Sequence, residues 1–102
     1  MLKLSKSQLE QRIRQIAKED TSRLVFTRHT EMRMRERKIS KTMALDCLRN
    51  GHIRRIPEPN TLYGTIECRM EHYAAGVTFG LVIAVSELEP NLIIVTAMNI
   101  ED

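Results

Sequence analysis

The chain is organised around the stretch FTRHTEMRMRERKIS, residues 26–40, which places five cationic side chains and one histidine within about three helical turns. Thr27 is suited to cap this helix, because its hydroxyl can accept a hydrogen bond from a free amide of the first turn. His29 falls in that first turn and, at helical spacing, shares one side with Arg33 and Glu36. A histidine beside arginines on a basic helix is what a site for a phosphate ester requires.

The charge of the chain is divided unequally between its two halves. Residues 1–56 hold fifteen of the sixteen Lys and Arg residues and six of the thirteen acids, a net charge of +9, whereas the remainder sets Arg69 against seven acids. A basic half attracts polyanions, because each neutralised phosphate releases counterions. We therefore predict that nucleic acid contacts the basic helix. The alternative is that the two halves are simply solvated surfaces of opposite charge. The predicted nucleic-acid contacts are the cations that fan out around the helix: Arg28, Arg35, Arg37 and Lys38.

A chain of 102 residues forms one domain, here residues 1–102, with a single modest core. No segment approaches the roughly 20 apolar residues that span a bilayer, and the first residues lack the apolar run of a signal peptide. We therefore expect a cytoplasmic protein without a membrane segment. Cys47 and Cys68 have no recognisable spacing and lie in apolar segments, which favours reduced core thiols over a disulfide.

The first helix is predicted over residues 8–18. Ser7 and Glu10 match a capping box, and Ser5 with Gln8 offers an alternative register. Apolar residues recur at the spacing of one helix face, opposite charged side chains, as in an amphipathic surface helix.

Two further helices follow with almost no loop between them. The basic helix is expected over residues 28–38, after a short extended segment at 24–26, and Ser40 caps a third helix over residues 41–50. Gly51 is expected to supply the left-handed residue that commonly ends a helix.

After Gly51 the periodicity changes to that of strands. Short turns between strands imply antiparallel neighbours, so the sequence predicts an α+β domain in which three N-terminal helices pack on one face of a mostly antiparallel four-stranded sheet. The predicted strands are residues 52–56, 62–73, 77–86 and 92–98, with turns at 57–60, 74–76 and 87–91.

The available ligand residues lack the spacing of a metal site, and no glycine-rich phosphate loop is present, so we predict no metal and no cofactor. What remains is acid–base chemistry on a phosphodiester, which needs a proton acceptor, a proton donor and cations for the developing charge. His29, Arg33 and Arg69 are the candidate catalytic residues. Two of these residues have a structural alternative: His29 can be bonded to nearby backbone, and Arg69 can form a cross-strand or flanking salt bridge to a glutamate. His72 falls on the apolar face of its strand, as a core or rim histidine does.

Three blocks of this chain resemble a family of small bacterial and phage proteins of uncharacterised function. The blocks are F-T-x-H at residues 26–29, M-x-E-R-x-I-S at 34–40 and L-x-x-G at 48–51. Strand segments that include Tyr63-Gly64 and Cys68-Arg69 extend the resemblance over residues 24–98. The positions carried over from the motif are His29, Arg33, Glu36, Arg37 and Arg69.

Members of this family resemble the RelE and BrnT group of toxins, and some are similar to MqsR-type toxins in being encoded beside a zinc-finger antitoxin. The resemblance implies a RelE-like fold, RNA cleavage and restraint by a partner antitoxin. RelE-like ribonucleases tend to present Arg, Lys, Tyr or His on their last strands, and residues 92–102 offer none.

Charge, candidate chemistry and resemblance together predict a metal-independent, RNA-cleaving toxin of a toxin–antitoxin pair. The first alternative is a non-catalytic module that uses helix 28–38 to bind nucleic acid or an acidic partner. The second is a homo-oligomer in which the acidic sheet of one copy docks on the basic helices of another.

Overall fold

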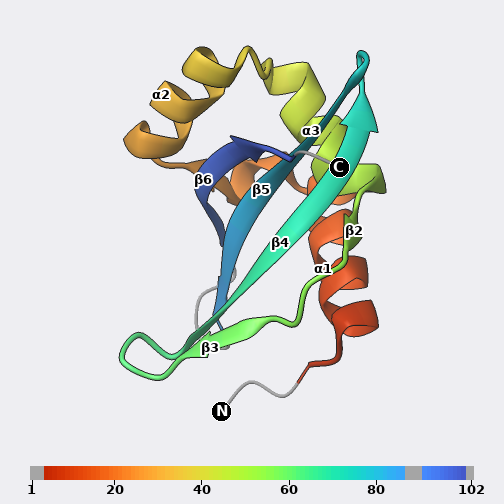
Figure 1. The fold of residues 1–102 in the computed structure, drawn as a ribbon. Coiled ribbons are helices and arrows are strands. Elements are labelled where there is room, and N and C mark those ends of the chain that lie inside the picture. The colour runs from red at the N-terminus through yellow and green to blue at the C-terminus, as the bar shows by residue number, and fades with distance from the viewer. Residues whose placement is uncertain (1–3, 87–90, 101–102) are drawn as a thin grey trace.

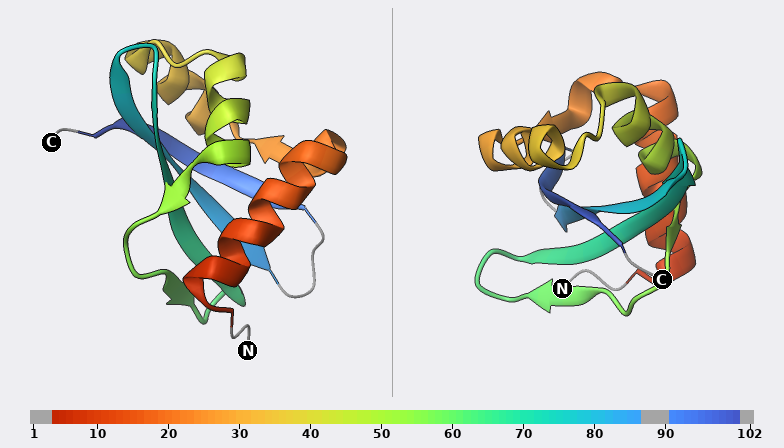
Figure 2. Two further views of the ribbon diagram at one scale, coloured as in Figure 1. Left: turned by 90° about the vertical axis from the view of Figure 1, so that its right-hand side faces the viewer. Right: turned by 45° about the horizontal axis from the view of Figure 1, so that its top comes forward.

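The computed structural model describes residues 4–86 and 91–100. Within them lie three α-helices, one short 3-10 helix and six strands that form one mixed sheet. α1 and α3 cover one face of this sheet, and no described helix lies on the other face (Figures 1 and 2). The α+β class is confirmed. The predicted count of four strands is wrong, because the extended segment at 24–26 and the predicted turn at 57–60 both contribute short strands to the sheet.

α1 spans Lys6–Glu19 and buries one apolar stripe against α3. Its capping box uses the alternative register: the Ser5 hydroxyl accepts from the Gln8 amide (3.2 Å), and the Gln8 side chain accepts from the Ser5 amide (2.8 Å). The expected box of Ser7 and Glu10 is therefore wrong. Glu10 has a different function, since its carboxylate accepts a hydrogen bond from the backbone amide of Ile53 (2.6 Å).

α2 (Arg28–Arg37) and α3 (Lys41–Asn50) begin at Thr27 and Ser40, whose hydroxyls accept backbone amides of the first turn as predicted. The left-handed residue of this region is Lys38 (φ 58°), which ends α2, and not Gly51, whose backbone is extended (φ −76°, ψ −179°). The expected role of Gly51 is therefore wrong. Gly51 lies where chains approach closely: a Cβ there would be 2.5 Å from the Cys47 carbonyl oxygen and 2.8 Å from that of Glu71.

The sheet has the strand order β1-β6-β5-β4-β2, and β3 also pairs with β4. Its centre is the predicted antiparallel meander of β4 (Thr65–Ala74), β5 (Val77–Ser86) and β6 (Leu92–Asn99). At one edge β1 (Leu24–Phe26) pairs with β6 in parallel, which makes the sheet mixed. α2 continues from β1 along the second half of β6, so it lies at the sheet edge and not over the face (Figure 1).

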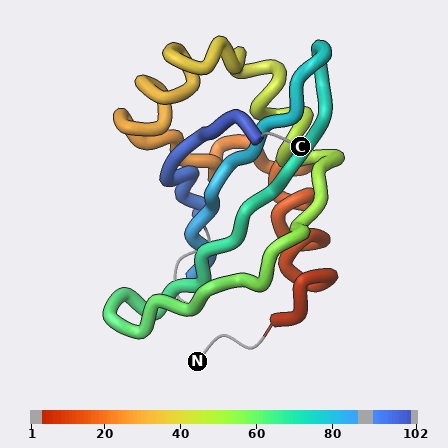
Figure 3. The backbone as a smooth tube through the Cα atoms, viewed as in Figure 1, coloured from red at the N-terminus to blue at the C-terminus, as the bar shows by residue number. Residues whose placement is uncertain are grey.

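At the other edge, the chain between α3 and β4 runs along β4 (Figure 3). The predicted strand 52–56 is shorter, β2 (His52–Ile53), and the predicted turn 57–60 is largely a strand, β3 (Glu58–Asn60). Proline is tolerated in β3 because an edge strand does not need every amide. The predicted strand 62–73 begins three residues later, after a turn in which Gly64 has φ 64°.

The turn between β4 and β5 is a tight hairpin turn. Ala75 and Gly76 both have positive φ (53° and 80°), as in the tight two-residue turns that suit the twist of a hairpin. Most of the predicted turn at 87–91 lies outside the described residues.

The core lies between the inner face of the sheet and the helices. Both cysteines are free and buried in it, and burial raises the pKa of the Cys47 and Cys68 thiols to about 12. Buried thiols with a raised pKa are protonated at neutral pH, so they resemble core cysteines and not reactive ones. Among the described residues, none of the helices is long and apolar enough to cross a bilayer.

Candidate nucleic-acid interface

The N-terminus of α2 is bonded directly to β6. The Thr30 hydroxyl, which is completely buried, donates to the Ile94 carbonyl and lies 2.7 Å from the Thr27 hydroxyl. The Thr27 amide donates to the same Ile94 carbonyl (3.3 Å). Because these bonds cross between elements far apart in sequence, they fix where the first turn of α2, and therefore His29, lies on the sheet.

Replacing Thr30 with Val tests this attachment, because Val keeps the shape of the side chain and removes the hydroxyl. The Ile94 carbonyl then retains only the longer bond from Thr27, and we expect a loss of about 1–2 kcal/mol in the free energy of unfolding. Thr30→Ser keeps the hydroxyl and loses one methyl group, about 0.8 kcal/mol. Urea unfolding should therefore rank wild type above Ser and Ser above Val. A Val variant as stable as the Ser variant would show that the hydroxyl does not hold α2.

His29 is exposed in the first turn of α2, and its Nε2 atom lies 3.3 Å from the Thr96 hydroxyl of β6. Its partner is thus a side chain across the edge of the sheet, and not the nearby backbone considered as an alternative. A hydroxyl can donate or accept, so this contact leaves either tautomer of the imidazole open. The ring is oriented yet accessible, as a proton-transfer residue must be.

The cations of α2 fall into two groups. Arg33 forms an ion pair with Glu36 one turn away (3.0 Å), with side chains that are 41% and 48% exposed. The predicted nucleic-acid contacts are all exposed, and none makes an ion pair with another described residue. This second group carries the uncompensated charge of the helix: Arg28, Arg35, Arg37 and Lys38.

Arg69 lies on the helix-free face of the sheet and is committed to internal contacts. Its Nε and Nη2 atoms donate to one Glu71 oxygen (3.1 and 2.8 Å), and its Nη1 atom contacts the Met98 sulfur (3.5 Å). Both members of the ion pair are largely buried, with side chains 17% and 9% exposed. The flanking ion pair that we set against a phosphate-binding role is therefore present.

The structure brings His29 and Arg69 to the same face of the sheet, but not into contact. Arg69 is paired with Val82, which is paired with Thr96, the partner of His29. Two strand spacings, about 10 Å, thus separate the Cα atoms of Arg69 and Thr96. The Arg69 guanidinium extends across this distance to Met98 on β6, two residues from Thr96. Its donors to Glu71 would have to be released before it could bind a phosphate beside His29.

Sequence reasoning missed a hydrogen-bonded pair on the opposite side of the molecule. The Nε2 atom of His72 lies 2.8 Å from an Asp46 oxygen, and the Asn50 amide donates to the other oxygen of the same carboxylate (2.7 Å). These bonds from His72 and Asn50 lower the pKa of Asp46 below its usual value. The spacing of Asp46 and Asn50 on one helix was visible in the sequence, but their link to His72 depends on how α3 packs on β4.

Among residues 4–86 and 91–100, His, Cys, Asp and Glu side chains form no group of three that is placed to hold a metal ion.

The fold is an α+β domain with a basic helix at one sheet edge (Figure 1). Comparison with known families shows which protein family the chain belongs to. The chain belongs to the domain family of unknown function DUF4258, whose model matches residues 26–99. The expectation of an uncharacterised family is thereby confirmed. The match covers α2, α3 and the strands β2 to β6, and it leaves out α1. No curated protein and no solved structure matches the chain.

Proposed function

We propose that this chain is an RNA-cleaving toxin of the RelE-like type, which binds RNA along α2 and cleaves it at His29 without a metal ion. The observation that carries the proposal is the position of an accessible imidazole at the start of a helix whose other end carries exposed cations that make no ion pair with any described residue. RNA can thus be held by its phosphates and presented to an imidazole that can transfer a proton.

In this proposal His29 transfers a proton at the scissile phosphodiester. As a base it accepts the proton of the ribose 2′-hydroxyl, whose oxygen then attacks phosphorus while the bond to the 5′-oxygen breaks. Solvent water protonates the leaving 5′-oxygen, and the other product is a 2′,3′-cyclic phosphate. We assign the reacting phosphate to Arg28, which is exposed in the same turn and makes no ion pair with a described residue. Arg33 and Arg69 can assist only if phosphate displaces their present partners, Glu36 and Glu71.

The proposed partner is an antitoxin, of the zinc-finger type that the family resemblance implies, which restrains the toxin in the cytoplasm. A chain with this charge distribution offers such a partner the exposed cations of α2. An acidic segment of the antitoxin that covers α2 would exclude RNA by competition for the same charges.

The ion pairs of Arg33 and Arg69 favour a second candidate function, a non-catalytic module that binds RNA through α2 alone. Incubating pure protein with RNA in the presence of EDTA separates the two. Defined fragments that accumulate with time support the toxin, whereas a shifted but intact RNA supports the binding module.

Both functions require that RNA bind to α2, and a double substitution tests this. For single-stranded RNA each phosphate contact contributes roughly 0.7 to the slope of log affinity against log salt. Arg35→Ala with Arg37→Ala should therefore lower the slope by about 1.4. Lys6→Ala with Lys18→Ala removes the same charge from exposed positions of α1 and should leave the slope unchanged. Equal effects of the two pairs would show that RNA does not select α2.

A further inference from the structure

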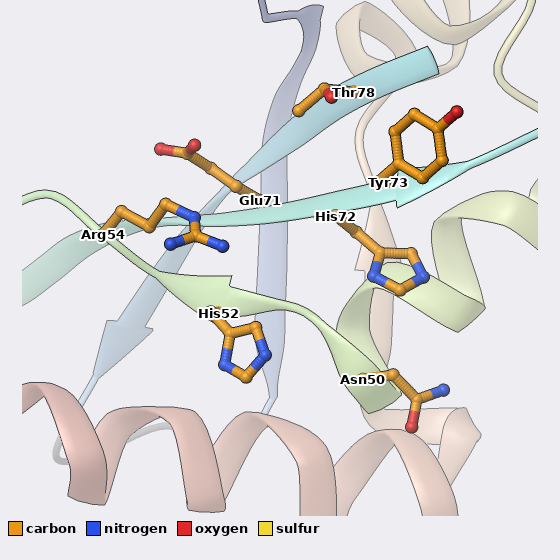
Figure 4. A pocket seen from close by; sticks show the side chains of 7 residues that line it. All are labelled: Asn50, His52, Arg54, Glu71, His72, Tyr73 and Thr78. Atoms are coloured by element: carbon orange, nitrogen blue, oxygen red, sulfur yellow. The ribbon is translucent and has the colours of Figure 1, made fainter. Parts of the chain in front are cut away.

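A hollow of about 570 Å³ lies at the end of α3, between β2 and the part of β4 that extends beyond it (Figure 4). Its volume is within the range of about 300–1,000 Å³ that is usual for small-molecule sites. Six of the side chains that line it bear on what it can bind: Asn50, His52, Arg54, Glu71, His72 and Tyr73.

The two histidines of the hollow are held in opposite tautomers. Asp46 is a carboxylate, so His72 donates to it from Nε2 (2.8 Å), and in the neutral imidazole the lone pair is then on Nδ1. At His52 the neighbour is Arg14, whose Nη2 atom is 3.1 Å from Nδ1 and can only donate. The His52 proton is therefore on Nε2. His72 thus offers an acceptor, and His52 offers a donor.

The charged group of the hollow that remains available to a ligand is positive. Both carboxylates next to it are already bound, Asp46 to His72 and Glu71 to Arg69 (2.8 Å each). The Glu10 carboxylate, 4.0 Å from His52, accepts the Ile53 amide. Arg54 is exposed and makes no ion pair with any described residue. An anion is therefore the favoured occupant.

Two further features narrow the chemistry of this anion. The Tyr73 ring is 67% exposed and presents an aromatic surface beside the hollow (Figure 4). The Nδ1 lone pair of neutral His72 can accept a hydrogen bond from a ligand that carries a donor, such as a hydroxyl group. A ribonucleoside monophosphate has a group for each of these side chains. Its phosphate suits Arg54 and His52, a ribose hydroxyl suits His72, and its base suits Tyr73.

We infer that this hollow is a ribonucleoside monophosphate site, in which Arg54 and His52 bind the phosphate, His72 accepts from the ribose and Tyr73 stacks on the base. The site is independent of the proposed RNA cleavage, since it shares no residue with α2. Asp46 is a positioning residue, because it acts through His72.

Titration with AMP, followed by calorimetry and by the backbone amide signals of β2 and β4, tests the site. We expect a dissociation constant below about 1 mM and signal changes confined to the hollow. Arg54→Ala should weaken binding at least about tenfold, because it removes a charge-assisted contact. Arg55→Ala removes a neighbouring exposed cation that does not line the hollow and should leave binding unchanged. Equal effects of the two variants, or no binding at about 10 mM AMP, would overturn the inference.

The proposed contact of His72 with the ribose is tested separately, by comparing the binding of AMP with that of an analogue that lacks the ribose hydroxyls. Wild-type protein should prefer AMP over its 2′,3′-dideoxy analogue, and His72→Phe should bind both equally, because it lacks the acceptor for the ribose. The Asp46 side chain is 44% exposed and stays solvated in this variant, so the fold is retained. A ribose preference that survives His72→Phe would exclude the proposed contact. AMP binding that disappears in the Arg35→Ala, Arg37→Ala variant would move the site to α2 and overturn the proposal.

Discussion

Gly51→Ala should lower the free energy of unfolding by about 3 kcal/mol or more. Its added Cβ would lie 2.5 Å from the Cys47 carbonyl oxygen and 2.8 Å from the Glu71 carbonyl oxygen. Both atoms belong to the backbone, of α3 on one side and β4 on the other, so neither can rotate away. The backbone of Gly51 is extended and open to alanine, and the whole cost is therefore steric.

Gly76→Ala is the matched control for this substitution. Gly76 has φ 80°, which strains alanine, but a Cβ added there would meet no atom within 4 Å. Its expected cost is about 1–2 kcal/mol, from conformation alone. Urea unfolding followed by circular dichroism measures both variants. A Gly51→Ala variant no less stable than Gly76→Ala would mean that α3 and β4 can separate without penalty.

His29→Ala should reduce RNA cleavage at least about 100-fold, the usual contribution of a general acid or base. The side chain is exposed and its contact to Thr96 is long, so the free energy of unfolding should change by no more than about 0.5 kcal/mol. RNA binding should persist, because the cations of α2 remain. The measurement is the rate of fragment formation in EDTA, at protein concentrations that saturate the RNA.

Met32→Ala is the control for the surface of the helix. Met32 is 51% exposed on α2 and offers no proton, so its loss should leave the cleavage rate unchanged. Cleavage that survives His29→Ala would remove this histidine from the mechanism. Cleavage that falls equally in both variants would indicate that the substitutions act through the helix and not through the imidazole.

The fold could be predicted from the sequence where local signals and packing agree. α3 has the predicted bounds because Ser40 is a strong cap, and β5 has its predicted bounds because two positive-φ residues define the hairpin. β1 and β3 could not be predicted as members of the sheet. β1 has three residues and is stabilised by its parallel partner β6, and β3 depends on the neighbouring β4 to order a segment with prolines.

The candidate site could be predicted only in part, for a related reason. The exposure of the α2 cations follows from helical spacing, which a sequence shows directly. The ion pairs of Arg33 and Arg69 involve neighbours at spacings of three and two residues, and the sequence shows these as alternatives without deciding between them. The bond between Asp46 and His72 joins residues 26 positions apart, and local patterns carry no information about it.

The parallel pairing of β1 with β6 has a consequence for synthesis on the ribosome. Residues 24–26 find their partners only at 92–94, and Thr30 binds Ile94 across 64 residues. While translation is under way, the basic helix has no anchoring surface until residues 92–94 have emerged from the ribosome. A nascent chain that has not yet exposed β6 therefore cannot place His29 beside Thr96, so the arrangement proposed for attack on RNA forms only after β6 has been made.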